Sequence, residues 1–339
     1  TINGDLNLSS VQILHNYSLV GTKITGDTNL SSITLVDKSA FWSARINGDI
    51  NLSSAQSVIN NAFGFATING DINLSSVTSV GENAFNNAKI TGDINLSSVT
   101  SDIHSTTFQD ASINGDLNLS SLTELNNDAF ERATINGELN LSSLTAFNYN
   151  EFSTKCKSLD GGLNLSSLES VGDLAFQGAT INGDLNLSSV TELSDDAFQN
   201  ATINGELNLS SLTAFNYKEF SANGGSLGGS LNLSSVTDLS DNAFRDASIN
   251  GDLNLSSVTD LSFSNFYGVK IGGDLNLSGI TSFNYSDFSA NVASLGGGLN
   301  LSSVQIINDF SNATINGDLN LSSAQSVGDY AFQDASING

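Results

Sequence analysis

The sequence predicts an α/β solenoid, a right-handed coil in which a short strand and a short helix recur along the whole chain. Three observations predict it: a unit of about 22 residues that occurs fifteen times, apolar residues at fixed positions of every unit, and exposed positions that hardly vary. A chain of 339 residues could hold two or three ordinary domains. The repeat instead indicates one continuous array over residues 1–339.

We number the unit from the Ile of the phrase Ile-Asn-Gly-Asp-Leu-Asn-Leu-Ser-Ser, which is position 0. Successive units begin 22 residues apart in most of the chain. The spacing is 23 residues after Ile90, 24 after Ile135, Ile203 and Ile271, and 20 after Leu295. The three 24-residue units lie 68 residues apart, so residues 135–336 contain three-unit super-repeats.

Two apolar patterns define the elements of each unit. Positions 4 and 6 are aliphatic, as in Ile72 and Leu74, and this alternation predicts a strand with one buried face. Position 17 is Phe in fourteen of fifteen units, commonly with Ala before it and another Ala three residues later, as in Ala84, Phe85 and Ala88. Together with position 12, these spacings predict one face of a short helix. Stacked units then give one parallel sheet face, with short helices or helical turns on the other.

Position 2 is Gly at every start of the unit, from Gly4 to Gly339. Such constancy predicts a positive φ angle or a close backbone approach between neighbouring coils. A phosphate-binding loop would instead show one special Gly-rich turn.

Composition excludes several classes of function. The chain carries 35 acidic against 10 basic residues, and a net charge of −25 argues against nucleic acid and anionic membranes as partners. One cysteine allows no intrachain disulfide, and no apolar run is long enough to span a membrane. The charges recur as columns, and no nucleophile–base pair is recognisable, so we expect no enzymatic activity.

The column at position 3 is acidic in twelve of fifteen units. The simpler interpretation is that the carboxylates splay into solvent, which limits their repulsion. The alternative is that successive carboxylates share Ca²⁺, the one cofactor that the pattern suggests. The candidate calcium ligands at the start of this column are Asp5, Asp27, Asp49, Asp71, Asp93 and Asp116.

The column at position 5 is Asn in all fifteen units. In-register Asn side chains can form a ladder of amide hydrogen bonds along the solenoid. Each Asn also begins an Asn-Leu-Ser acceptor sequence for N-glycosylation. Both interpretations concern the same residues, namely Asn7, Asn29, Asn51, Asn73, Asn95, Asn118, Asn140, Asn164, Asn186, Asn208, Asn232, Asn254, Asn276, Asn300 and Asn320. Further acceptor sequences begin at Asn16, Asn200, Asn284 and Asn312.

Each 24-residue unit contains the phrase Phe-Asn-Tyr, with its tyrosine at Tyr149, Tyr217 or Tyr285. These tyrosines are either exposed contact aromatics or side chains packed against the enlarged loop, and packing is the favoured interpretation. Cys156 lies between two lysines and is expected to be an incidental surface thiol.

One phrase resembles a known family. Val77-Thr78-Ser79-Val80-Gly81-Glu82-Asn83-Ala84-Phe85 is similar to the Val-Thr-Ser-Ile-Gly-x-x-Ala-Phe phrase of BspA-type leucine-rich repeats, and related phrases run from Val190 to Phe198 and from Ala324 to Phe332. The resemblance implies a leucine-rich-repeat-like coil. It also implies a protein exposed on the cell surface that serves adhesion and partner binding.

These observations predict a non-enzymatic extracellular structural or adhesive protein. The chain begins and stops in the same phase of the repeat, so we expect part of a longer array, or a filament or stalk formed by end-to-end stacking with itself. Lateral self-association is a further expectation. The alternative is a module that binds a host or matrix protein or a glycan, and a minor alternative is an ice-binding surface.

Overall fold

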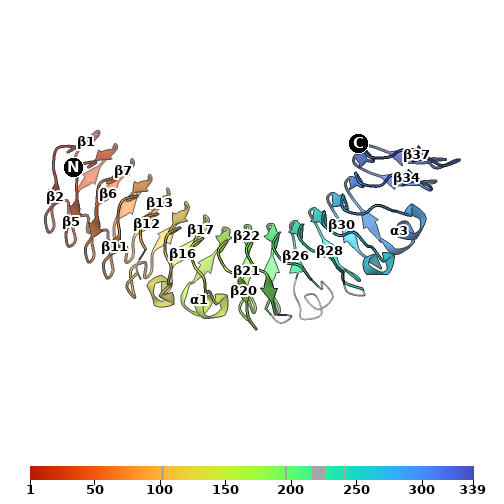
Figure 1. Cartoon of the computed structure of the whole chain (residues 1–339). Helices are drawn as coiled ribbons and strands as arrows, with labels where there is room; N and C mark the ends of the chain where they lie inside the picture. Colours follow the sequence, from red (N-terminus) through yellow and green to blue (C-terminus); the bar gives the residue numbers. More distant parts are fainter. Residues whose placement is uncertain (101–102, 195–196, 216–225, 240–241) are drawn as a thin grey trace. The chain divides into compact units, whose positions relative to one another are not determined.

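The computed structural model describes residues 1–339 except 101–102, 195–196, 216–225 and 240–241. The chain is a parallel β-solenoid with little helix, and each coil contributes up to three strands of two residues (Figure 1). It forms two compact units, Thr1–Leu168 with Ile181–Gly183, and Glu169–Thr180 with Asp184–Gly339.

Positions 4 and 5 form the first ladder, the position-4 ladder, present in every coil. In the first unit its strands are β1 (Leu6–Asn7), β4 (Thr28–Asn29), β7 (Ile50–Asn51), β10 (Ile72–Asn73), β13 (Ile94–Asn95), β15 (Leu117–Asn118), β17 (Leu139–Asn140) and β19 (Leu163–Asn164). In the second unit they are β22 (Leu185–Asn186), β25 (Leu207–Asn208), β27 (Leu231–Asn232), β29 (Leu253–Asn254), β31 (Leu275–Asn276), β33 (Leu299–Asn300) and β36 (Leu319–Asn320).

Positions −1 and 0 form the second ladder, the position-0 ladder. Its strands are β3 (Lys23–Ile24), β6 (Arg45–Ile46), β9 (Thr67–Ile68), β12 (Lys89–Ile90), β14 (Ser112–Ile113), β16 (Thr134–Ile135), β18 (Ser158–Leu159), β21 (Thr180–Ile181), β24 (Thr202–Ile203), β26 (Ser226–Leu227), β28 (Ser248–Ile249), β30 (Lys270–Ile271), β32 (Ser294–Leu295), β35 (Thr314–Ile315) and β38 (Ser336–Ile337).

Positions 11 and 12 form a third ladder in some of the described coils. Its strands are β2 (Ile13–Leu14), β5 (Leu35–Val36), β8 (Ser57–Val58), β11 (Ser79–Val80), β20 (Ser170–Val171), β23 (Glu192–Leu193), β34 (Ile306–Ile307) and β37 (Ser326–Val327). The strands pair in parallel, with equivalent positions side by side, as in Ile72 against Ile94. The third ladder was not predicted, because its strands alternate only briefly between polar and apolar residues.

The predicted interior is confirmed. Side chains at positions 0, 4, 6, 9 and 17 are fully buried in most coils, as for Ile68, Ile72, Leu74, Val77 and Phe85. The phenylalanines of successive coils stack face to face. Centroid separations are 4.8 Å for Phe41 and Phe63, and 5.0 Å for Phe63 and Phe85. Each coil therefore buries its apolar side against its neighbours, as a repeat of this length requires.

The prediction of a helix in every coil is wrong. Within the described residues, α-helix occurs at α1 (Tyr149–Lys155) and α3 (Tyr285–Asn291), and 3₁₀ helix at η1 (Asn127–Phe130) and η2 (Phe263–Phe266). Most other coils form turns after position 12. In these turns, successive N–H groups donate alternately to a carbonyl of the next coil and to one of their own coil. Phe63 N donates to Ala84 O at 2.7 Å, while Gly64 N donates to Asn61 O at 3.0 Å.

This turn segment requires left-handed residues at positions 15 and 19. Asn61 and Phe65 have φ angles of 61° and 57°, and Asn83 and Asn87 follow the same pattern at 56° and 57°. With left-handed residues four positions apart, every second N–H points along the solenoid, which a helix cannot do. The stack of coils thereby satisfies backbone groups that a 22-residue helical coil would have to satisfy locally.

The 24-residue units that begin at Ile135 and Ile271 have room for a helix, and their Phe-Asn-Tyr phrase begins it. Asn148 is the N-cap of α1, and its side chain accepts a hydrogen bond from Glu151 N at 3.2 Å. Asn284 caps α3 in the same way, through Asp287 N at 3.2 Å. The extra residues of these units therefore form a capped helix.

The position-2 glycines are explained by close approach in most coils. A Cβ atom on Gly48, Gly70 or Gly92 would lie less than 3.0 Å from the backbone of the preceding coil's glycine. Gly4, in the first coil, has a positive φ of 116°.

Candidate binding surface

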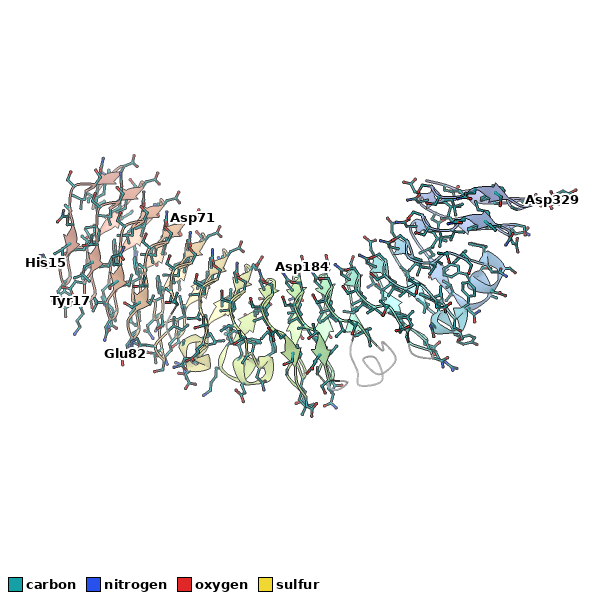
Figure 2. The ribbon with its side chains drawn as sticks, in the orientation of Figure 1. His15, Tyr17, Asp71, Glu82, Asp184 and Asp329 are labelled. Carbon is teal, nitrogen blue, oxygen red and sulfur yellow. The ribbon has the colours of Figure 1, made fainter. Side chains whose placement is uncertain are left out.

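The acidic column at position 3 binds the backbone of the neighbouring coil. Where an Asp at position 3 is followed by an acidic residue in the next coil, its carboxylate accepts a hydrogen bond from the backbone N–H of that residue. The donor–acceptor distance is 3.0 Å from Asp27 N to Asp5 Oδ1, 2.9 Å from Asp71 N to Asp49 Oδ1, and 2.7 Å from Asp116 N to Asp93 Oδ1. Figure 2 shows Asp71 on the opposite edge of the coils from Tyr17 and Glu82.

The same hydrogen bond to the next coil forms where Ser replaces the acidic residue at position 3. Ser230 has a hydroxyl at position 3, and its Oγ accepts from Asp252 N at 2.9 Å. An Asp or Ser at position 3 therefore accepts from an N–H that turns out of the ladder at the corner of the next coil. This role, which spacing alone did not suggest, accounts for the constancy of the column without a bound cation.

The calcium alternative gains no support from the geometry. Across the described ranges, no group of three or more His, Cys, Asp or Glu side chains is arranged to hold a metal ion. The six candidate ligands from Asp5 to Asp116 use a carboxylate oxygen for the backbone of the next coil. Calcium binding stays a prediction for solution measurement.

The asparagine column at position 5 forms turns. In all fifteen coils the Asn side-chain oxygen accepts from the backbone N–H of the Ser two residues later, as from Ser75 N to Asn73 Oδ1 at 3.1 Å. The predicted amide ladder is formed at two described steps, Asn254 to Asn232 at 3.3 Å and Asn276 to Asn254 at 3.2 Å. The turn is therefore the general role of these residues, and the ladder a local addition. Glycosylation of the column stays a prediction.

The structure places two of the three tyrosines in the interior. Tyr149 is 6% exposed and Tyr285 is 8% exposed, so neither is a surface contact aromatic. The hydroxyl of Tyr285 donates to Thr314 O at 3.1 Å and accepts from Thr314 N at 3.1 Å. Packing, the favoured interpretation, is confirmed for both tyrosines, because α1 and α3 draw them into the coil. Tyr217 lies outside the described residues.

Cys156 is buried, and its prediction as a surface thiol is wrong. It is the C-cap residue of α1, and its Sγ lies 3.4 Å from Ala133 O and 3.4 Å from Ser158 O. Burial raises the pKa of the thiol to about 12, which opposes formation of the reactive thiolate. The flanking lysines are exposed and do not offset the burial.

One groove lies on the position-4 ladder of the second unit. Its volume is about 340 Å³, and it opens where Gly298 interrupts the acidic column. Asp252, Asp274 and Asp318 line it together with asparagines of position 5. Asp274 uses a carboxylate oxygen to accept from Gly298 N at 2.6 Å, so the groove follows from the missing side chain.

A further outward column at position 18 escaped the sequence reasoning because its residue type varies. In several coils it holds amides that bond from coil to coil. Asn86 donates to Gln109 at 3.1 Å, Gln109 to Glu131 at 2.7 Å, and Gln177 to Gln199 at 2.7 Å. A search for outward positions of variable type, instead of constant ones, would have found this column.

Comparison with known proteins decides the family. The model of the BspA-type leucine-rich-repeat region, in six copies, matches residues 34–160 and 155–272, which together exceed half of the chain. The chain belongs to the BspA-type leucine-rich-repeat family. No curated protein matches this BspA-type chain. A leucine-rich-repeat protein from Eubacterium ventriosum is 14% identical over 94% of this chain and 83% of its own, with a TM-score of 0.24.

The BspA-type chain shows no membrane-crossing helix in the part that the structure describes. None of its helices has the length and apolar character that crossing a bilayer requires.

Proposed function

We propose that this chain is a non-enzymatic structural or adhesive protein of the cell surface, which presents repeated shallow contacts along a solenoid. The observation that carries the proposal is the regular exterior. The carboxylates of position 3 and the amides of position 5 serve the backbone of their own solenoid in coil after coil. Such columns suit multivalent contact, because each coil offers the same weak contact at a fixed spacing.

Family membership supports the same proposal. BspA-type repeats are typical of non-enzymatic surface proteins, and the chain belongs to that family. Self-association, end to end or lateral, is part of the proposal, because an exposed coil edge of this fold offers unpaired backbone groups to a further coil.

Adhesion by the displayed chain tests the proposal. The whole chain is displayed on a non-adherent bacterial cell, and attachment to immobilised host cell layers and matrix is counted against cells that display a scrambled sequence. We expect attachment that depends on the number of chains displayed, since each contact is weak. Attachment equal to the scrambled control at every display level would contradict the proposal.

Negative-stain microscopy of the purified chain tests self-association. Fibres whose length grows with protein concentration are the expected result. Single particles at every concentration would remove self-association from the proposal and leave adhesion by the isolated solenoid, the alternative of a ligand-binding module.

A further inference from the structure

The first coils of the chain carry an aromatic group where later coils carry amides. In the position-18 column the residues are Val20, Trp42 and Gly64, and Phe65 follows at position 19. The ring centroids of Trp42 and Phe65 lie 4.7 Å apart at an interplanar angle of 54°. Phe65 is 46% exposed and Val20 is 41% exposed. Trp42 is half-buried and is the only tryptophan in the chain.

The coils that surround Trp42 are adapted to it. A Cβ atom on Gly64 would lie 2.5 Å from Cζ3 of the indole, so the ring rests where any larger residue would place its side chain. Phe65 holds a φ of 57°, at a position that is Gly, Asn, Asp or Ser in most other coils. A bulky residue in the left-handed region carries backbone strain. Because Phe65 is exposed, burial of its ring gains little free energy and does not explain why the chain accepts this strain.

A row of cations lies on the position-0 ladder of the first coils. Lys23, Arg45 and Lys89 occupy position −1 of the position-0 ladder, in register with Thr67 between the last two. All three cations are exposed, and none forms an ion pair within the described part of the chain. Arg45 follows Trp42 by three residues, with the buried Ala44 between them at the corner of the coil.

This combination is unusual in a chain with a net charge of −25 and only 10 basic residues. Unpaired cations in a row, about 4.8 Å apart for adjacent strands, attract a linear ligand with repeated negative charges. Exposed aromatic faces bind flat, weakly polar surfaces such as the C–H face of a sugar ring. Asn86 and Asn87 lie at positions 18 and 19 of the following coil and offer amide groups at the edge of the rings.

We propose that Lys23, Arg45, Lys89, Trp42 and Phe65 form a binding site, the aromatic–basic site, for an acidic oligosaccharide. The rings stack on the sugar, and the cations pair with its carboxylate or sulfate groups. The inference names the ligand class of the adhesive surface and rests on the proposed function.

Trp42 provides its own reporter, because the chain has no other tryptophan. The purified full chain is titrated with a heparin octasaccharide at low and at physiological salt while the tryptophan emission is recorded. We expect a saturable change in emission that weakens with salt, since the attraction is screened. Neutral dextran of equal length should cause no change. An unchanged emission throughout the titration would overturn the proposal.

Three sets of substitutions separate the contributions of the cations and of the indole to octasaccharide binding. Lys23→Gln/Arg45→Gln/Lys89→Gln should weaken octasaccharide binding at least tenfold and leave the emission of the free protein unchanged. Gly64→Ala should displace the indole and weaken binding without a change in charge. The control is Arg245→Gln/Tyr267→Ala/Lys270→Gln, which removes two cations and an exposed ring from positions 18 and −1 in the second unit.

The control variant should bind like the unchanged chain. Equal loss in the control and in the triple variant would show general attraction to polyanions and overturn the site. Duplex DNA that binds as tightly as the octasaccharide would also overturn it, since the rings would then contribute nothing. Circular dichroism spectra and melting temperatures check that every variant is folded.

The adhesion assay distinguishes this inference from the proposed function. If cells that display the triple variant attach as well as the unchanged chain, the proposed function stands and the aromatic–basic site fails as its basis. If the octasaccharide binds but displayed chains never attach, the site stands and the adhesive function fails.

Discussion

At the residue scale, the constant polar positions serve the backbone. Asp71 and Asn73 each accept a hydrogen bond from a main-chain N–H, one in the next coil and one in their own. Because these N–H groups lie where the chain turns out of its ladder, a carboxylate or amide oxygen takes the place of the missing strand partner. Sequence constancy at such positions therefore indicates a structural need, which leaves the columns only repeated weak contacts, and a site specific for one ligand is better sought where constancy is broken.

Thr28 is the one described polar residue at position 4, and its buried hydroxyl is unsatisfied. It is 1% exposed, and its Oγ1 has no hydrogen-bond partner. Thr28→Val keeps the shape and removes the buried hydroxyl, so the free energy of unfolding should rise by about 1–2 kcal/mol. Urea denaturation measures it. In the control Thr25→Val, which removes the acceptor of Gly4 N, no rise is expected. Lack of a rise for Thr28→Val would contradict the account.

Asp71 tests the role of the acidic column. Asp71→Ala leaves Asp93 N without its acceptor and should lower the free energy of unfolding by about 1–3 kcal/mol. Asp71→Asn keeps an acceptor and removes a like charge between Asp49 and Asp93, so its loss should be smaller. Chemical denaturation of both variants at low and high salt gives the comparison. Equal losses, with a melting temperature that falls on chelation, would favour a bound cation instead.

At the element scale, the stacking of coils decides between helix and turn. Most 22-residue coils form turns with left-handed residues four positions apart, whereas the 24-residue units that begin at Ile135 and Ile271 form the capped helices α1 and α3. Both conformations bury the Phe of position 17, as for Phe85 and Phe152. Positions 16 and 20 are buried in the turns, as for Ala84 and Ala88, whereas Glu151 and Lys155 are exposed there in α1. The turn is favoured in the shorter coils because every second N–H then donates a hydrogen bond to the neighbouring coil.

Asn61 tests the turn. Its φ is 61°, and its N–H donates to Glu82 O at 3.0 Å. Asn61→Gly should change the free energy of unfolding by less than about 0.5 kcal/mol, whereas Asn61→Val should lower it by about 1–3 kcal/mol. Asn60→Val, one residue earlier and without a positive φ, is the control for β-branching. The account fails if the two valine variants lose the same amount.

At the scale of the whole molecule, each compact unit is a sum of similar coils. Every described ladder pairs equivalent positions of successive coils, so a coil is defined by its length and register, and its stability comes from its neighbours. This organisation also concentrates specificity, because only residues that depart from the columns, such as Trp42 and Lys89, distinguish one coil from another.

Deletion of one coil tests this view. Removal of residues 67–88 takes out one 22-residue coil of the first unit and joins Ala66 to Lys89 in phase. Folding should persist, with a small decrease in melting temperature and in the denaturant m-value, because one coil and one interface are lost. Removal of residues 67–77 breaks the register and should abolish cooperative unfolding of this unit. Circular dichroism melts compare them, and equal melting of both deletions would refute the register argument.

The sequence by itself determined the repeat, the buried columns and the family, because side-chain periodicity along a chain directly encodes which face is inward. Tertiary structure alone decided that most coils turn instead of forming a helix, that Asp71 caps the next coil, and that Tyr149, Tyr285 and Cys156 are buried. It also decided that Gly64 makes room for Trp42. The physical reason is that these features depend on hydrogen bonds and contacts between residues about 22 positions apart, which exist only once the coils have stacked.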